Sequence, residues 1–142
     1  GSQGNPMFKT ILFPVDQSQE AVEAAEVVVN LVQTYQSKLI LLSVVEKATA
    51  EELSSSDEMK SPEKVEKLLQ DAKDFFFNQG IEAEVIEKEG KPAFVICDVA
   101  DETKANIIVM GCRGLGLTEE GSHDSVTNRV INLSPCPVLI VP

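Results

Sequence analysis

Glycines are concentrated just after a short apolar segment in the last third of the chain, at Gly111, Gly114 and Gly116. Glycine allows tight backbone turns, and such a turn can point successive N–H groups into one concavity that binds an anion. Ser125 lies further along, at the predicted start of a helix, where its hydroxyl, free N–H groups and the helix dipole favour negative charge. These residues predict a phosphate site, and the alternative interpretation is a tight turn that binds nothing.

Other side chains of the sequence offer less chemistry. Asp16 ends the first apolar segment without a partner nucleophile, so we expect it to have a structural or ribose-binding role. Arg113 could neutralise a phosphate or pair with Glu119 and Glu120 of the same loop. The only histidine, His123, lies in a polar stretch with no second acid or base at a fixed spacing. We therefore predict no catalytic residue and no metal site.

The three cysteines, Cys97, Cys112 and Cys136, are odd in number and irregularly spaced. This arrangement fits neither a disulfide framework nor paired metal-ligand spacings, so a reducing cytoplasm is the expected location. Cys97 shares an apolar helix face and is predicted to lie in the core. Cys112 either fills space in the glycine-rich loop or is a thiol of lowered pKa that senses oxidants.

The composition indicates one acidic domain. The chain has 142 residues, 43% of them hydrophobic, and a formal net charge of -11, which is enough apolar material for one core. We expect a single domain over residues 7–142, and we interpret residues 1–6 as a remnant of an expression vector. So negative a surface repels nucleic acid and anionic lipid, and no apolar run is long enough to cross a membrane. We therefore expect neither nucleic acid nor a membrane as a partner.

Apolar runs alternate with segments of helical spacing along the chain. Strands are predicted at residues 8–15, 37–45, 81–87, 106–110 and 137–141, and helices at residues 18–35, 62–80, from 90 onward and 125–133. Residues 46–61, rich in Ala, Thr, Glu and Ser, are predicted to form an excursion between two elements. This alternation predicts a Rossmann-like α/β fold, with one doubly wound, five-stranded parallel sheet of order 3-2-1-4-5 and helices on both faces.

In a doubly wound sheet, ligands bind outside the carboxyl ends of the strands, where the connections diverge to opposite faces. The candidate site therefore lies just after the first, second and fourth strands. The residues of this sequence at those places are Pro14, Val15, Asp16, Val44, Met110 and Gly111.

Three segments of the chain resemble the universal stress protein family in their order and spacing: Lys-Thr-Ile-Leu-Phe-Pro-Val-Asp at residues 9–16, Ile-Ile-Val-Met-Gly-Cys-Arg-Gly at 107–114, and Ser-Pro-Cys-Pro-Val-Leu-Ile-Val at 134–141. The resemblance covers nearly all of residues 7–142. The nucleotide-binding branch of that family has the pattern Gly-x2-Gly-x9-Gly-Ser/Thr. Gly111 and Gly114 match its first two glycines, and Ser125 matches its hydroxyl residue. The resemblance implies an adenine nucleotide with its phosphates in this loop.

The same resemblance implies particular contacts. Asp16 would contact the adenosine, the backbone of Val44 would border the adenine, and Val126 would donate a backbone N–H to the phosphates. The full set of residues expected to bind the nucleotide is Pro14, Val15, Asp16, Val44, Met110, Gly111, Arg113, Gly114, Asp124, Ser125, Val126 and Thr127.

The sequence departs from the family pattern at Asp124, which stands where the third glycine is expected. A carboxylate at about 4 Å from a phosphate costs on the order of 1 to 4 kcal/mol, depending on screening by water. Two arrangements would relieve this repulsion: a divalent cation such as Mg²⁺ could bridge Asp124 and the phosphates of ATP, or the ligand could carry fewer phosphates. We expect the second, with AMP or ADP favoured over ATP.

Three functions remain open at the level of sequence. The first is a stress-response regulatory module that binds an adenine nucleotide and acts on an unknown protein partner, as a homodimer through the apolar last strand, which the resemblance also implies. The second is a protein-interaction module of the same family that binds no nucleotide. The third is slow ATP hydrolysis or self-phosphorylation on Ser125 or Thr127, for which no Walker lysine or general base is present.

Overall fold

The computed structural model describes residues 8–15, 20–45, 62–111 and 122–141. Its five strands form one sheet in the order β3-β2-β1-β4-β5, and all four pairings are parallel. The strands are β1 (Thr10–Pro14), β2 (Lys38–Val45), β3 (Ala83–Glu89), β4 (Ile107–Gly111) and β5 (Val138–Val141). The predicted fold class and strand order are confirmed.

Helices connect successive strands of this sheet. They are α1 (Glu20–Tyr35), α3 (Pro62–Asn78), α4 (Pro92–Thr103) and α5 (Ser122–Leu133). Pro62 and Pro92 each open a helix, as expected of a residue whose fixed φ suits the first turn and whose missing N–H is not needed there. The prediction for α5 began it at residue 125, and the helix begins three residues earlier, at Ser122.

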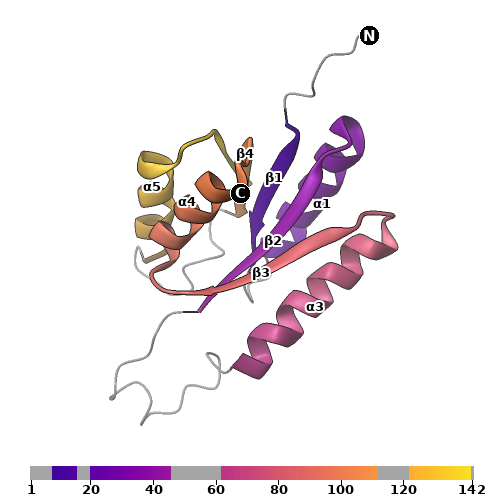
Figure 1. Cartoon of the computed structure of the whole chain (residues 1–142), viewed down its shortest axis with the longest axis horizontal. Helices are drawn as coiled ribbons and strands as arrows, with labels where there is room; N and C mark the ends of the chain where they lie inside the picture. The colour runs from indigo at the N-terminus through magenta and orange to yellow at the C-terminus, as the bar shows by residue number, and fades with distance from the viewer. Residues whose placement is uncertain (1–7, 16–19, 46–61, 112–121, 142) are drawn as a thin grey trace.

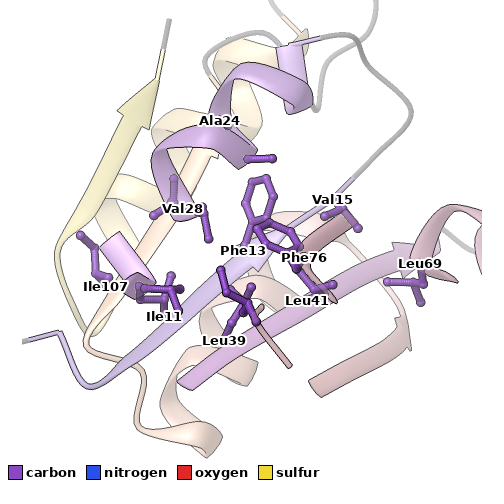
Figure 2. Packing of buried hydrophobic residues seen from close by; sticks show 14 residues of the cluster. Ile11, Phe13, Val15, Ala24, Val28, Leu39, Leu41, Leu69, Phe76 and Ile107 are labelled. Atoms are coloured by element: carbon purple, nitrogen blue, oxygen red, sulfur yellow. The ribbon is translucent and has the colours of Figure 1, made fainter. Parts of the chain in front are cut away.

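Each face of the sheet is covered by its own pair of helices, α1 with α3 on one face and α4 with α5 on the other (Figure 1). Side chains alternate across a strand, so Ile11 and Phe13 of β1 enter the first cluster and Leu12 enters the second. In the first cluster the rings of Phe13 and Phe76 meet edge to face with centroids 6.1 Å apart (Figure 2). The second cluster contains Leu12, Ile40, Leu42, Ile96, Cys97, Ile108, Met110 and Val130.

The two edge strands differ in character. β3 presents the exposed charged residues Glu84, Glu87, Lys88 and Glu89, whereas β5 consists of Val138, Leu139, Ile140 and Val141. Charged side chains on an edge strand oppose pairing with another sheet, and an uncharged edge leaves that pairing open. The edge position predicted for the third strand is confirmed, although the strand spans Ala83–Glu89 rather than residues 81–87.

A glycine turn ties β3 and α4 to the end of β2. The N–H of Gly90 donates to the carbonyl oxygen of Val45 at 2.9 Å, and Gly90 has φ of +145°. A Cβ atom at this position would lie 2.9 Å from Cγ2 of Val95, so the turn requires glycine. Within the described residues, no helix is both long and apolar enough to cross a membrane.

Candidate functional site

The carboxyl edge of the sheet splits between its two central strands. Paired positions of β1 and β4 end at Leu12 with Ile108, although β1 continues to Pro14 and β4 to Gly111. Each strand stays paired with its outer neighbour up to its last residue, Pro14 with Leu42 of β2 and Gly111 with Val141 of β5. The main chains of β1 and β4 therefore leave their mutual ladder at the edge where ligands of doubly wound sheets bind.

The connections after β1 and β4 lead to opposite faces of the sheet. β1 is followed by α1, which packs in the first cluster, and β4 is followed by α5, which packs in the second. This divergence between adjacent strands is the topological switch point of the fold. We call its described residues the carboxyl-end site: Pro14, Val15, Val44, Met110 and Gly111.

On the β1 side, the backbone is held in place and the side chains face inward. The N–H of Val15 donates to the carbonyl oxygen of Leu42 at 2.8 Å, which extends the pairing with β2 by one residue. The side chains of Pro14 and Val15 are buried, so these residues position the chain that follows. Asp16, the residue predicted to contact adenosine, comes next and lies outside the described residues.

Val44 lies two residues beyond Leu42 on β2, at the same edge of the sheet. Its side chain is half-buried against the second cluster, and its neighbour Val45 accepts the Gly90 N–H. The β2 backbone at Val44 is therefore fixed from both sides, by β1 at Leu42 and by the Gly90 turn at Val45. Val44 therefore lies at the carboxyl edge of the sheet, and its contact with adenine stays a prediction from the resemblance.

On the β4 side, Met110 is 1% exposed and belongs to the second cluster, whereas Gly111 is half-buried at the end of the strand. The burial of Met110 makes it a structural support of the site, and Gly111 is the last described residue before the loop. Arg113 and Gly114 lie outside the described residues. The predicted nest of loop N–H groups therefore remains a prediction.

Helix α5 connects the parallel strands β4 and β5, so it begins on the carboxyl side of the sheet. Because it begins at Ser122, the N–H groups that lack partners within the helix belong to its first residues and precede Val126. Asp124 and Ser125 lie in this opening turn by backbone position, and their side chains are outside the described set. The side chain of Val126 packs against the second cluster, and its predicted main-chain contact with a phosphate stays a prediction.

Thr127 is the one buried hydroxyl of the described residues that lacks a hydrogen-bond partner. The residue is 9% exposed, and neither a carbonyl of α5 nor any other described group accepts from or donates to its Oγ1. Leaving a buried polar group unsatisfied costs about 1 to 3 kcal/mol. Among the described residues, this hydroxyl is therefore a polar group whose hydrogen-bonding capacity is unused.

Burial disfavours the thiolate form of both described cysteines. Burial, helped by the charge of Asp98 and by Cys136, raises the pKa of the Cys97 thiol, and burial raises the pKa of Cys136 against the opposing hydrogen bond from Ser134. A raised pKa keeps a thiol protonated at neutral pH, and the protonated form is a poor nucleophile. The predicted core position of Cys97 is confirmed, since it is 8% exposed within the second cluster. Cys112 lies outside the described residues.

Two further features of the site concern metals and main-chain contacts. Among the residues that the structure describes, no three His, Cys, Asp or Glu side chains are placed to hold a metal ion.

The carbonyl oxygens of Leu42 and Val45, which fix the β1 and β2 ends, were not predicted from the sequence. Main-chain acceptors exist at every residue, so side-chain types carry no signal for them; the Gly-Lys-Pro turn at 90–92 was the only clue.

The split edge and the diverging helices define a doubly wound α/β protein with its topological switch point between β1 and β4. A model of the universal stress protein family matches residues 7–142. Universal stress protein Sll1654 of Synechocystis sp. is 60% identical over 99% of this chain and 90% of that protein, and YxiE of Bacillus subtilis is 33% identical over 95% and 99%. The chain belongs to the universal stress protein family.

Solved structures share the fold over almost the whole chain. The structure of hypothetical protein MJ0577 is 28% identical, with a TM-score of 0.79 over 95% of this chain and 96% of that one. A universal stress protein in complex with cAMP is 22% identical, with a TM-score of 0.73 over 96% and 98% of the two chains. The Archaeoglobus fulgidus protein in complex with dAMP is 20% identical, with a TM-score of 0.70 over 96% and 99%.

Proposed function

We propose that this chain is a regulatory stress-response module that binds an adenine nucleotide at the carboxyl-end site. The observation that carries the proposal is the parting of β1 and β4 at Leu12 and Ile108, two strands whose connections lead to opposite faces. In doubly wound sheets this is the position where nucleotides bind. The adenosine would lie toward Val44 on β2, and the phosphates toward the start of α5.

The charge of the chain limits how an anion can be held. The formal net charge is -11, so the protein as a whole repels a phosphate. Main-chain N–H groups at the opening of a helix attract an anion through the helix dipole without any basic side chain. Helix α5 connects the parallel strands β4 and β5, so its amino-terminal end, at Ser122, would supply such groups on the carboxyl side of the sheet.

The number of phosphates is limited by Asp124. A carboxylate in the first turn of a helix interacts favourably with the same dipole that a phosphate would use, and it repels a phosphate nearby. Each added phosphate increases this repulsion, so AMP or ADP is favoured over ATP. Binding of ATP would need a cation such as Mg²⁺ to screen the carboxylate.

A homodimer through β5 accompanies this function. Residues 138–141 form an uncharged edge strand, with Leu139 36% exposed, whereas the opposite edge carries charged side chains. Pairing of β5 with β5 of a second copy would satisfy the free main-chain groups and cover the apolar residues. The site would then report nucleotide occupancy to a protein partner from within a dimer. We propose no catalytic activity for this chain.

A second candidate is an interaction module that binds no nucleotide, and Asp124 favours it. The structural relatives crystallised with cAMP and dAMP are 22% and 20% identical, a likeness that extends to the fold alone. The argument for a ligand therefore rests on this chain's own residues.

Isothermal titration with AMP, ADP and ATP, each with and without magnesium, tests the proposal. We expect AMP and ADP to bind more tightly than metal-free ATP, and magnesium to improve ATP alone. Tighter binding of metal-free ATP would contradict the role of Asp124. Failure of all three nucleotides to bind would favour the interaction module.

A further inference from the structure

Two cysteines that are far apart in the sequence meet at the second cluster. Cys97 comes from α4 and is 8% exposed within that cluster, whereas Cys136 lies in the bend between α5 and β5 and is half-buried against the cluster. Both are free thiols, and the proposed nucleotide site uses neither. The fold therefore holds one buried thiol and one more accessible thiol in the same apolar region.

The end of α5 connects these two thiols. The thiol of Cys97 contacts the carbonyl oxygen of Val130, with 3.9 Å between sulfur and oxygen. The same carbonyl oxygen accepts the N–H of Ser134 at 2.8 Å. The hydroxyl oxygen of Ser134 in turn lies 3.7 Å from Sγ of Cys136. Both sulfur atoms are therefore held at the carboxyl-terminal end of α5, through one carbonyl and one serine.

The electrostatics of the two thiols agree with this placement. The pKa of Cys97 is raised by burial first, then by the charge of Asp98 and by Cys136. One ionisable group acts on another by an interaction that weakens with distance and is screened by solvent. The effect of Cys136 on Cys97 therefore fits a short separation in a poorly solvated region.

The surroundings of the two thiols differ in a way that gives them different chemistry. The Ser134 hydroxyl accepts the N–H of Cys136 at 3.1 Å and lies 2.6 Å from its carbonyl oxygen, so it fixes the backbone of this cysteine. Its hydrogen bond to the thiol also lowers the pKa of Cys136 against the larger effect of burial. Cys97 is less exposed and faces the negative charge of Asp98. Because the thiolate is the nucleophile, Cys136 is the thiol that a small oxidant reaches first.

We propose that Cys97 and Cys136 are a modification site that forms a reversible disulfide when the protein reacts with a peroxide. The Cys136 thiolate attacks one oxygen of hydrogen peroxide, the O–O bond breaks, and hydroxide leaves as water with the proton that the thiol released. The Cys97 thiolate then attacks the sulfur of the Cys136 sulfenic acid; the S–S bond forms, the S–O bond breaks, and a second water leaves with the Cys97 proton. Two thiols and one hydrogen peroxide thus give one disulfide and two waters.

Two properties of this reaction follow from the structure. Burial raises the pKa of both thiols, so little thiolate is present at neutral pH and the reaction is slow there. The disulfide would tie α4 to the bend before β5 and close a loop that contains β4 and α5. Closing such a loop restricts the unfolded chain, so we expect the oxidised protein to unfold in urea at a midpoint roughly 1 M higher than the reduced protein.

Peptide mapping of the peroxide-treated protein tests the proposal. The full chain is treated with hydrogen peroxide, its remaining thiols are alkylated, and it is digested without reductant for mass spectrometry. We expect one pair of peptides joined through Cys97 and Cys136, and its loss on treatment with dithiothreitol. The rise of the urea midpoint should appear with the linked peptide and disappear on reduction. The Cys112→Ser variant should give the same linked pair, since the third cysteine takes no part.

Three variants assign the roles of the groups. Cys97→Ala should stop the reaction at a Cys136 sulfenic acid, which dimedone labels, and Cys136→Ala should leave Cys97 reduced. Ser134→Ala removes the hydroxyl that stabilises the Cys136 thiolate, so it should slow disulfide formation roughly two- to tenfold. Ser134→Thr keeps a hydroxyl and should restore the rate, which a purely structural role of Ser134 in the bend would not predict for the oxidation rate alone.

Several results would overturn this inference. Both thiols could stay free under peroxide that oxidises cysteamine fully in the same time, or they could reach sulfinic or sulfonic acid without any linked peptide. A disulfide of Cys136 with Cys112, or with Cys136 of a second chain on a non-reducing gel, would also contradict the pairing. Nucleotide titrations do not bear on these outcomes, because the two thiols lie outside the carboxyl-end site.

Discussion

Under the proposed function, Asp124 is the residue that would decide which anion the start of α5 can accept. Its backbone lies in the first turn of the helix, where a carboxylate and a phosphate compete for the same dipole. In the resemblance to nucleotide-binding universal stress proteins, glycine occupies this position. This one difference from the family pattern would account for the proposed preference for fewer phosphates.

Replacement of this residue by glycine tests the preference. We expect Asp124→Gly to raise the affinity for metal-free ATP roughly 5- to 30-fold, which corresponds to about 1 to 2 kcal/mol, because a nearby like charge is removed. The gain should shrink with added salt, since salt screens exposed charges. Asp124→Asn removes the charge without the added backbone freedom of glycine, so it separates the two effects. Calorimetry at two salt concentrations measures the nucleotide affinities of both variants. An unchanged ratio of ATP to AMP affinity would contradict this role.

The carboxyl ends of the strands, rather than their central residues, position the site. The N–H of Val15 donates to the carbonyl oxygen of Leu42, and the N–H of Gly90 donates to that of Val45. These main-chain hydrogen bonds anchor the strand ends around Val44. The turn at Gly90 is the tightest of these anchors, because its φ of +145° and the nearby Val95 side chain both exclude a Cβ atom.

Substitution of alanine in the Gly90 turn should therefore destabilise the protein. Gly90→Ala forces an unfavourable φ and a contact of 2.9 Å with Val95, and we expect it to lower the free energy of unfolding by about 2 to 4 kcal/mol. Gly80→Ala is the matched control, since Gly80 has φ of +81° with nothing within 4 Å of a Cβ atom, so only the backbone cost of about 1 to 2 kcal/mol applies. Urea unfolding measures both, and an equal loss would show that the Val95 contact has no effect.

The sequence predicts most of these elements because apolar periodicity reports packing. Residues 39–42 form a continuous apolar run because β2 is buried on both faces. Predictions fail where main-chain bonds continue without apolar side chains: β3 extends to Glu89 because it stays paired with Val45 of β2. Helix α5 begins at Ser122 although its apolar spacing starts only at Val126.

At the site, the strand-end residues could be predicted because topology alone places them at one edge of the sheet. Pro14, Val44 and Gly111 lie there as expected. The free state of the Thr127 hydroxyl could not be predicted, since it depends on the rotamer and on how neighbouring elements pack. Residues in the loop after Gly111 gave the strongest sequence signal, and they lie outside the described residues.

The whole molecule has one protected edge and one open edge. Among the described residues, charged side chains lie along β3, whereas β5 is uncharged, so the proposed pairing with a second copy is favoured at β5. Pairing through β5 would keep the carboxyl-end site within each subunit, because β4 separates β5 from β1.

A pair of matched variants tests this assembly. Leu139 of β5 and Val85 of β3 are both 36% exposed, at opposite edges of the sheet. We expect Leu139→Lys to convert a dimer into a monomer, because a buried unpaired charge at the interface is costly, and Val85→Lys to leave the dimer intact. Sedimentation velocity distinguishes these states. A monomeric wild type, or loss of the dimer in Val85→Lys alone, would rule out the β5 interface.

A crystal structure of the protein soaked with AMP would show whether an adenine nucleotide binds where β1 and β4 part. We predict adenine beside the backbone of Val44 and the phosphoryl group at the start of α5, within hydrogen-bond distance of Thr127. Density for AMP at any other place, or solvent alone at this edge under saturating nucleotide, would contradict the account.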